Sequence, residues 1–339
     1  MTAIQWTEQT WNPTTGCDRI SPGCDNCYAL TMAKRLKGMG SAKYQTDGDP
    51  RTSGPGFGIT THPDTLTEPL RWKKPRKVFV NSMSDLFHAR VPRDFLAQVF
   101  AVMAATPQHT YQILTKRPDR AARILGGSCK CGHPNGEHFR ASMEWAATSH
   151  SPAYVPGLEH GIYHRSGWPL PNVWIGTSVE NQKYADLRIP ALLKTPAAVR
   201  FLSCEPLLSP VRLFDTDHSQ HARDWDGEWI CLDCSTDEQT VPWRTTEPAQ
   251  LGIDWVIIGG ESGPGARPFQ SQWAASLIED ARAAGAAPFV KQLGTVWARD
   301  TYWAGKSVAA HGDTKGGDPT YWPANLRVRE YPTTTEAPR

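Results

Sequence analysis

Residues 78–85, VFVNSMSD, form an apolar run that ends in polar side chains, and this pattern recurs along the chain. It returns in YQILTKRP (111–118), VWIGTSVEN (173–181), VRFLSCEP (199–206), DWVIIGGESG (254–263) and PFVKQLG (288–294). Between these runs, apolar residues recur at helical spacing in 92–108, 181–195 and 271–286. Strands that alternate with helices favour a parallel sheet, and continuously apolar strands are covered on both faces. With one further strand in 4–13, the sequence predicts an α/β fold, a partial or irregular (β/α) barrel with about six or seven parallel strands.

Composition excludes several classes of protein. The chain has 339 residues, of which 39% are apolar and 21% charged, and its formal net charge is +2. These values exclude a collagen, a coiled coil and a disordered polymer, and the charge alone indicates neither a nucleic-acid nor a membrane surface. The sequence shows no run of about 18 apolar residues and no secretory signal, so we expect no membrane partner and a location in the cytoplasm. In that reducing compartment the eight cysteines are expected to be metal ligands or free thiols.

One barrel domain is expected over residues 1–297. Two stretches inside it, 126–170 and 215–248, are rich in Gly, Pro, His, Ser and Asp and lack periodicity, so we interpret them as insertions. Residues 298–339 form a C-terminal extension, and its tail, YPTTTEAPR, is expected to be disordered.

Three cysteines lie close together near the N-terminus, in GCDRISPGCDNCY (16–28). Cys17, Cys24 and Cys27 are spaced C-x6-C-x2-C, and three thiolates suit a cubane [4Fe–4S] cluster that keeps one iron without a protein ligand. A closed structural zinc site would take a fourth protein ligand. Incomplete zinc binding, and reduced cysteines with no metal, are the alternatives that the spacing leaves open.

The two insertions carry a second set of cysteines. SCKCGHPNGEHF (128–139) and WICLDC (229–234) each look like half of a zinc knuckle. The predicted zinc ligands are Cys129, Cys131, Cys231 and Cys234, with His133 or His138 able to replace one of them. Such a zinc would hold two inserted loops together and stabilise a region that has no core of its own. Unmetallated surface thiols are the alternative. The remaining Cys204 is expected to be a small buried residue.

Polar side chains follow the end of each predicted strand. Parallel barrels place their sites at the carboxyl ends of the strands, so these side chains should meet at one mouth. The cations expected there, for a carboxylate or phosphate, are Lys116, Arg117 and Lys291. The carboxylates expected there, for amines, hydroxyls or protons, are Asp85, Glu180, Glu205 and Glu261. We take Asp85, Lys116, Glu180 and Glu205 as the catalytic candidates, although any single carboxylate could instead cap a helix or tether a loop.

Several segments together resemble a known family. They are WTEQTWNPTTGC (6–17), SPGCDNCYA (21–29), NSMSDLFH (81–88), QILTKRP (112–118), WPLPNVWIGTSVENQ (168–182), LSCEPLL (202–208) and VIIGGESGPGARP (256–268). Over nearly all of its length apart from the insertions, the chain resembles a phage and prophage family of unassigned function, sometimes called the three-Cys-motif or phage radical-SAM-like family. That family looks distantly similar to the spore photoproduct lyase branch of the radical S-adenosylmethionine (SAM) enzymes.

The resemblance implies a partial (β/α) barrel with a [4Fe–4S] cluster on Cys17, Cys24 and Cys27. It implies that SAM binds the open iron through its amino and carboxylate groups, and that reductive cleavage gives a 5′-deoxyadenosyl radical. Gly259, Gly260 and Glu261 are similar to a GGE-type motif for the SAM amine, Lys116 would meet the SAM carboxylate, and Tyr28 would flank the adenine. The GGE motif of radical SAM enzymes lies near the second strand, where this chain has NSMSD, so Ser82, Ser84 or Asp85 is the alternative partner of the amine.

These expectations combine into a radical SAM-like iron–sulfur enzyme that acts on a nucleotide or nucleic-acid base in phage biology, by analogy of fold. Its implied partners in the host cell cytoplasm are a reductant of the flavodoxin or ferredoxin type and a phage-encoded protein. One alternative is a non-catalytic, metal-stabilised protein that binds nucleic acid or a partner, with zinc in both cysteine sets. The other is a barrel hydrolase that uses paired carboxylates such as Glu180 and Glu205.

Overall fold

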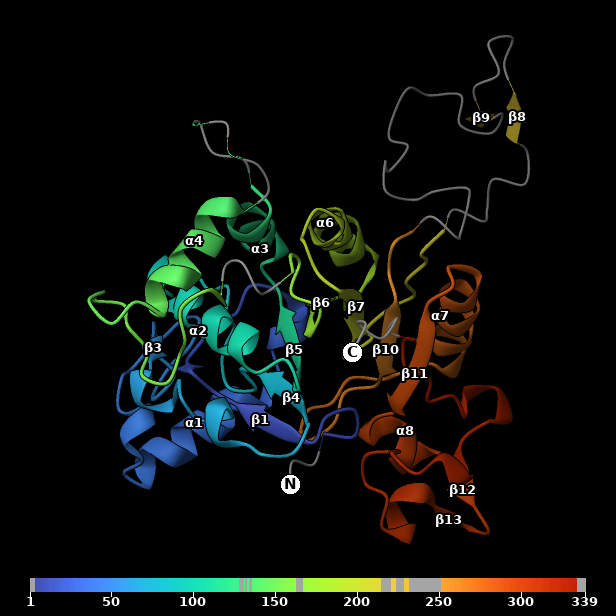
Figure 1. Ribbon diagram of the computed structural model, residues 1–339. Coiled ribbons are helices and arrows are strands. Elements are labelled where there is room, and N and C mark those ends of the chain that lie inside the picture. The colour runs from blue at the N-terminus through green and yellow to red at the C-terminus, as the bar shows by residue number, and fades with distance from the viewer. Residues whose placement is uncertain are drawn as a thin grey trace.

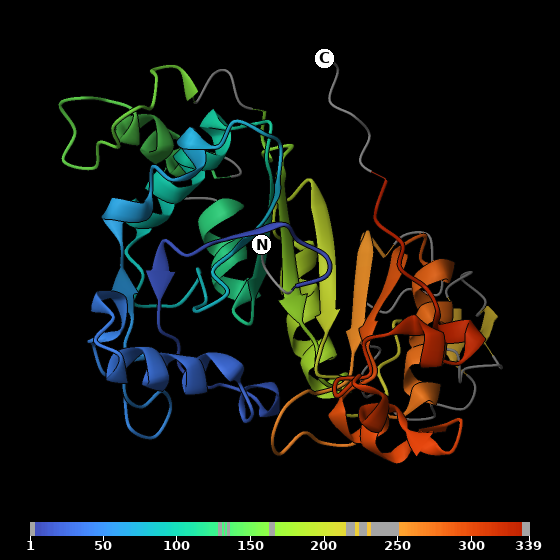
Figure 2. The same ribbon diagram turned by 90° about the horizontal axis from the view of Figure 1, so that it is seen from below.

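Seven strands form one sheet, and their order in the sheet follows their order in the sequence. They are β1 (Gln9–Trp11), β4 (Lys77–Val80), β5 (Thr110–Thr115), β6 (Val173–Ser178), β7 (Val199–Cys204), β10 (Trp255–Gly259) and β11 (Ala287–Gln292). The computed structural model describes residues 4–127, 131, 133, 136–162, 167–214, 221–223, 229–231 and 251–333. All six pairings in the sheet are parallel. The sheet curls without closing, which confirms the predicted partial (β/α) barrel (Figures 1 and 2).

Helices cover the outer face of the curled sheet. They are α2 (Arg93–Ala105), α3 (Pro118–Leu125), α6 (Gln182–Leu193) and α7 (Ser271–Ala283), and each connects two neighbouring strands or begins such a connection (Figure 1). The start of α6 is capped by Asn181, whose side-chain oxygen accepts a hydrogen bond from the Tyr184 amide at 3.1 Å. The outer core lies between these helices and alternate strand residues such as Val256 and Ile258.

The inner face of the sheet is filled by aromatic side chains. Phe79, Trp174, Phe201, Trp255 and Phe289 belong to one buried cluster there, together with Trp6 from the segment before β1. Gly176 makes room for this packing, because a Cβ at that position would lie 2.4 Å from the Phe201 ring. The interior is therefore solid near the amino ends of the strands, and only the carboxyl ends are left for a site.

The C-terminal extension is part of the barrel edge. The Val290 amide of β11 donates to Val328 at 2.8 Å, and Tyr331 stacks on Trp255 with ring centroids 5.4 Å apart. The expected boundary at residue 297 falls inside α8 (Thr295–Asp300). Residues 334–339 of the expected disordered tail lie outside the described residues.

Smaller elements surround the barrel. The helices are α1 (Tyr28–Gly38) and α4 (Glu137–Ala146), and the strand pairs are β2 (Thr14–Thr15) with β3 (Thr60–Thr61), β8 (His221–Arg223) with β9 (Trp229–Cys231), and β12 (Tyr302–Trp303) with β13 (Lys306–Ser307). Short 3-10 helices span Pro22–Cys24, Ala42–Tyr44, Pro63–Thr65, Pro69–Arg71, Val308–His311, Pro319–Tyr321 and Ala324–Leu326. Within the described part of the chain, no helix is both long and apolar enough to cross a membrane.

The first expected insertion has more structure than its composition indicated. Its helix α4 packs on α2, and Phe139 is fully buried with its ring centroid 5.2 Å from that of Phe100. The stretch 126–170 therefore contributes to the outer core. Of the second insertion, 215–248, only the backbone of β8 and β9 is described.

Candidate functional site

A cavity of about 320 Å³ lies at the carboxyl ends of the strands, where the sequence placed the site. The predicted site residues that line it are Cys17, Cys24, Cys27, Tyr28, Ser82, Ser84, Asp85, Lys116, Arg117, Glu205, Gly260, Glu261 and Lys291. Two predicted site residues, Glu180 and Gly259, do not line it. Apolar side chains that the sequence did not single out, Trp6, Phe79 and Leu114, line the same cavity. The strand-end pattern thus located the mouth of the barrel but not its apolar lining.

The three N-terminal cysteines sit on one loop that runs from β2 to α1. Gly16 begins this loop at a φ of +89°, where a Cβ would lie 2.1 Å from the Gly58 carbonyl oxygen, so only glycine fits. Cys24 ends the 3-10 turn Pro22–Cys24, and Cys27 is the residue before α1. All three cysteines are free thiols, Cys24 buried and the other two half-buried. The loop therefore brings three thiols to one wall of the cavity.

The three sulfurs do not form a compact, preformed set of metal ligands. A tetrahedral zinc has Zn–S bonds of about 2.3 Å, which puts its sulfur ligands about 3.8 Å apart. Of the described residues, the group whose ligand atoms all lie within 4.8 Å of one another is Cys131, His133 and His138, and the N-terminal cysteines form no such group. As the side chains lie in this structure, at least one pair of the three sulfurs is therefore more than 4.8 Å apart.

Carboxylates from distant strands hold the cysteine loop. Glu180 Oε1 accepts from the Gly23 amide at 3.4 Å, and Glu180 Oε2 is bound by the buried Arg188 at 2.8 Å. Glu180 is 1% exposed, and both of its oxygens are used. Its expected catalytic role is therefore replaced by a structural one, since a proton donor or acceptor must reach a ligand.

Glu261 has a similar role on the other side of the loop. Its oxygens accept from the Arg267 guanidinium at 2.7 and 2.9 Å and from Asn26 Nδ2 at 3.1 Å. Arg267 also donates to the Pro22 carbonyl at 2.9 Å. Burial raises the pKa of Glu261, but the hydrogen bonds from Arg267 and Asn26 outweigh it, so the net shift is downward. The carboxylate is thus ionised and occupied, and the structure gives it a tethering role in place of the expected contact with a ligand amine.

Asp18 anchors the loop directly after Cys17. Its carboxylate accepts from Arg90 at 2.7 Å and Thr52 at 2.8 Å, lies 2.9 Å from His88 Nε2, and is also bound by Ser53. These hydrogen bonds outweigh burial and hold the pKa of Asp18 well below its usual range. The sequence analysis missed Asp18, Asn26 and Arg267; their one signal was their position in or beside the segments that carried the family resemblance.

Cys17 lies beside a charged pair. Arg117 Nη1 donates to Asp85 Oδ2 at 2.8 Å and to Cys17 Sγ at 3.5 Å. Burial and the nearby Asp85 raise the pKa of the Cys17 thiol to about 12, although Arg117 opposes the shift. The free chain therefore carries a neutral thiol here, and a metal that binds must displace its proton.

Asp85 is also fully occupied. Oδ1 accepts from Thr115 Oγ1 at 2.7 Å and the Phe87 amide at 3.0 Å, and Oδ2 accepts from the Lys116 amide at 3.0 Å in addition to Arg117. A carboxylate with four donors has no room for a ligand amine. Asp85 therefore acts indirectly, by holding the Arg117 guanidinium in place.

Lys116 is the cation in the cavity that is left for a ligand. Its Nζ donates to Ser178 Oγ at 3.2 Å, and it has no salt bridge with any carboxylate of the described residues. Lys291, by contrast, is paired with Glu205 at 2.6 Å, and both side chains are 19% exposed. Lys116 thus suits a carboxylate or phosphate. Both acids of the hydrolase alternative are held in ion pairs, Glu180 with Arg188 and Glu205 with Lys291, and of the two only Glu205 lines the cavity.

Tyr28 opens α1 at the edge of the cavity. Its hydroxyl donates to the Ser82 carbonyl at 2.5 Å, and 58% of the residue is exposed. Ser82 in turn donates its hydroxyl proton to Asn12 Oδ1 at 3.2 Å. Since a hydroxyl has one proton and two lone pairs, Ser82 can still accept from a ligand.

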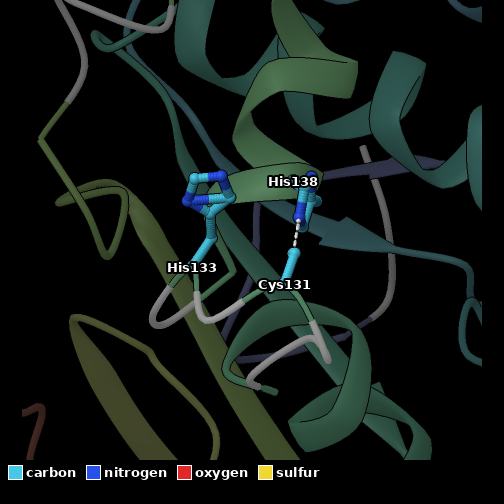
Figure 3. Close-up of side chains that lie close together, drawn as sticks. All are labelled: Cys131, His133 and His138. Atoms are coloured by element: carbon cyan, nitrogen blue, oxygen red, sulfur yellow. Dashed lines mark hydrogen bonds between the residues drawn. The ribbon is translucent and has the colours of Figure 1, made fainter.

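The second cysteine set is described only in part. Cys129, Cys234 and the side chain of Cys231 lie outside what the structure describes. Cys131, His133 and His138 lie together on the surface, with Cys131 Sγ 2.8 Å from His138 Nε2 (Figure 3). His133 Nδ1 lies 3.7 Å from Glu137 Oε2. Against the expectation of free thiols, Cys131 is disulfide-bonded, so a metal here would require its reduction. Cys204 is fully buried, as expected.

Comparison with known proteins gives a family without a function. No curated protein and no solved structure matches the chain. One family model, described as a protein of unknown function (DUF5131), matches residues 1–321. That match includes the cysteine loop and every strand of the curled sheet. The chain therefore belongs to the DUF5131 family of proteins of unknown function.

Proposed function

We propose that this protein is a radical SAM-type enzyme whose [4Fe–4S] cluster is held by Cys17, Cys24 and Cys27. The observation that carries the proposal is the placement of three free thiols from one loop at the mouth of a partial parallel barrel, beside the cation Lys116. Three ligands also leave one iron open for a substrate.

The bound cluster would supply the one electron that breaks the S–C5′ bond of SAM, giving methionine and a 5′-deoxyadenosyl radical. Lys116 binds the SAM carboxylate, because it is the unpaired cation of the described cavity. The Ser82 hydroxyl accepts from the SAM amine, since Asp85 and Glu261 are already occupied. The exposed residue Tyr28 would offer its ring to the adenine.

The substrate class follows from the apolar lining of the cavity. Trp6 is 4% exposed, and its Nε1 has no hydrogen-bond partner among the residues that the structure describes. The Trp6 and Phe79 rings meet edge to face, with centroids 4.8 Å apart. An apolar aromatic surface suits a flat ring such as that of a nucleobase. A nucleotide or nucleic-acid base is therefore the proposed substrate, and a flavodoxin- or ferredoxin-type protein of the host cytoplasm is the proposed electron donor.

A structural zinc is the proposed second metal. Cys131, His133 and His138 are of the residue types that zinc prefers, and Glu137 lies where it can orient His133. Zinc would bind the reduced sulfur and fix the loop before α4. Under reducing conditions the parent is expected to bind about one zinc per chain. A His133→Ala/His138→Ala variant is expected to lose this zinc and keep its iron. Equal zinc in both chains would contradict this ligand set.

The first test is anaerobic reconstitution with iron and sulfide, followed by metal analysis and visible absorbance. The parent chain is compared with the triple variant Cys17→Ala/Cys24→Ala/Cys27→Ala, and Cys204→Ala serves as the matched control because Cys204 is buried away from the cavity. About four irons per chain, retained in the control and lost in the triple variant, are expected. Zinc alone in all three chains would refute the cluster and favour a metal-stabilised binding protein.

The second test asks for the chemistry. The reconstituted parent is reduced with dithionite in the presence of SAM, and 5′-deoxyadenosine is measured by chromatography. Formation of this product in the parent but not in the triple variant is expected. A chain that carries four irons and never cleaves SAM would refute the radical SAM assignment while leaving the cluster in place.

A further inference from the structure

Arg117 connects the proposed cluster to the end of β5. Its Nη1 donates to Cys17 Sγ at 3.5 Å, and its Nη2 donates to the carbonyl of the next residue, Asp18, at 3.2 Å. Arg117 thus contacts both the ligand sulfur and the backbone beside it. Cys24 Sγ has a neutral hydroxyl neighbour, Ser21 Oγ at 3.8 Å. Of the three sulfurs, Cys17 is the one with a charged donor.

Hydrogen bonds to Asp85 and Thr115 hold Arg117 in place. Asp85 binds Nη1 at 2.8 Å, and the Arg117 amide donates to Thr115 Oγ1 at 2.9 Å. The Arg117 and Asp85 side chains are 15% and 7% exposed. Because Asp85 accepts four hydrogen bonds, it cannot rotate without breaking several of them. The position of the charge relative to Cys17 is therefore built into the fold.

We propose that Arg117 is a positioning residue that acts through Cys17 to raise the reduction potential of the cluster. This inference rests on the proposed function, since it assigns a role toward the same cluster. Reduction adds one negative charge to the cluster, and a cationic donor to a ligand sulfur stabilises the more negative state. The carboxylate of Asp85 acts in the opposite direction, so removal of the two charges should shift the potential with opposite signs.

The experiment is a redox titration of the reconstituted full-length chain, with the reduced cluster followed by electron paramagnetic resonance. Arg117→Gln removes the charge, Arg117→Lys keeps a charge without the planar fork, and Asp85→Asn removes the opposing charge. Arg120→Gln is the matched control, because Arg120 lies in the first turn of α3, three residues after Arg117, and donates to the carbonyls of His88 and Val91. Iron is counted in every variant before titration.

At the midpoint potential of the parent, Arg117→Gln is expected to show a ratio of reduced to oxidised cluster about tenfold lower, equal to a shift of about 59 mV for one electron. Arg117→Lys should lie between this variant and the parent, Asp85→Asn should shift upward, and Arg120→Gln should stay within about twofold of the parent. Equal reduction potentials in Arg117→Gln and Arg120→Gln, with four irons in each, would overturn the role of Arg117 but not the proposed function. A parent that takes up no iron would overturn the proposed function and this inference with it.

Discussion

The buried pair of Glu180 and Arg188 offers a sharp test of how the cysteine loop is held. The two side chains are 1% and 3% exposed and are joined at 2.8 Å. Glu180→Leu leaves the Arg188 charge buried without its partner, which costs about 3–5 kcal/mol. For 339 residues, an unfolding entropy of about 2.1 cal/mol/K per residue gives about 0.7 kcal/mol/K, so Tm should fall by about 4–7 °C.

The double variant Glu180→Leu/Arg188→Met separates stability from loop tethering. Replacing both charges by apolar groups removes the uncompensated charge, so Tm should return to within about 2 °C of the parent. The Gly23 amide, however, has lost its acceptor in both variants. Iron should therefore pass to an added chelator faster in the single and the double variant alike.

The assay is thermal unfolding followed by circular dichroism, together with iron release from the reconstituted chain. A single variant that melts at the parent temperature would refute the burial of this pair. If the double variant melts as low as the single one, the fall in Tm arises from lost packing and not from the unpaired charge of Arg188. Iron release equal to that of the parent in both variants would refute the role of Glu180 as a tether.

Three further predictions use other parts of the site. Gly16→Ala should lower the free energy of unfolding by about 2–4 kcal/mol and lower the iron content, because its Cβ would lie 2.1 Å from a backbone oxygen at positive φ. Gly38→Ala is the control, because a Cβ at Gly38 has open space, and it should lower neither the urea midpoint nor the iron content. Lys116→Met should weaken SAM binding by about tenfold or more in equilibrium dialysis of the reconstituted chain, and unchanged affinity would contradict the carboxylate contact. Burial lowers the pKa of His88 and His109 from 6.5, so the unfolded chain binds protons more readily and the free energy of unfolding should fall as the pH drops below about 6.5. Equal urea midpoints at about pH 7.5 and 5.5 would contradict this sign.

Most strands of the barrel were predictable because each is a short, largely apolar run that is buried on both faces, whereas β1 (QTW) has one buried residue, Trp11. Residues 173–181 and 199–206 each contain an observed strand, β6 and β7, and their polar ends lie where parallel strands place them. The helix α4 was missed because the turn-rich composition of 126–170 favoured an insertion, although the buried residues Phe139, Met143 and Ala146 recur at the helical spacing i, i+4 and i+7.

The site was predictable as a set of positions but not as a set of contacts. Sequence shows that Glu180 and Glu261 follow strands, yet it does not show that Arg188 and Arg267 fold back onto them. Pairing depends on side-chain direction in three dimensions, which one strand-end pattern cannot report. Cys17, Cys24 and Cys27 were found because three cysteines within eleven residues are a signal in the chain itself.

The cysteine loop is completed by residues that are made much later. Asn26 is bound by Glu261 and by the Gly265 carbonyl, and Pro22 by Arg267, across 235 to 245 residues of sequence. During synthesis, the three thiols leave the ribosome long before these partners exist. A chain that emerges from its N-terminus at about 5–20 residues per second spends about 12–50 seconds with an unanchored loop. The anchored form of this loop exists only after Glu261, Gly265 and Arg267 have been translated, so the proposed cluster would meet its final ligand geometry only after that point.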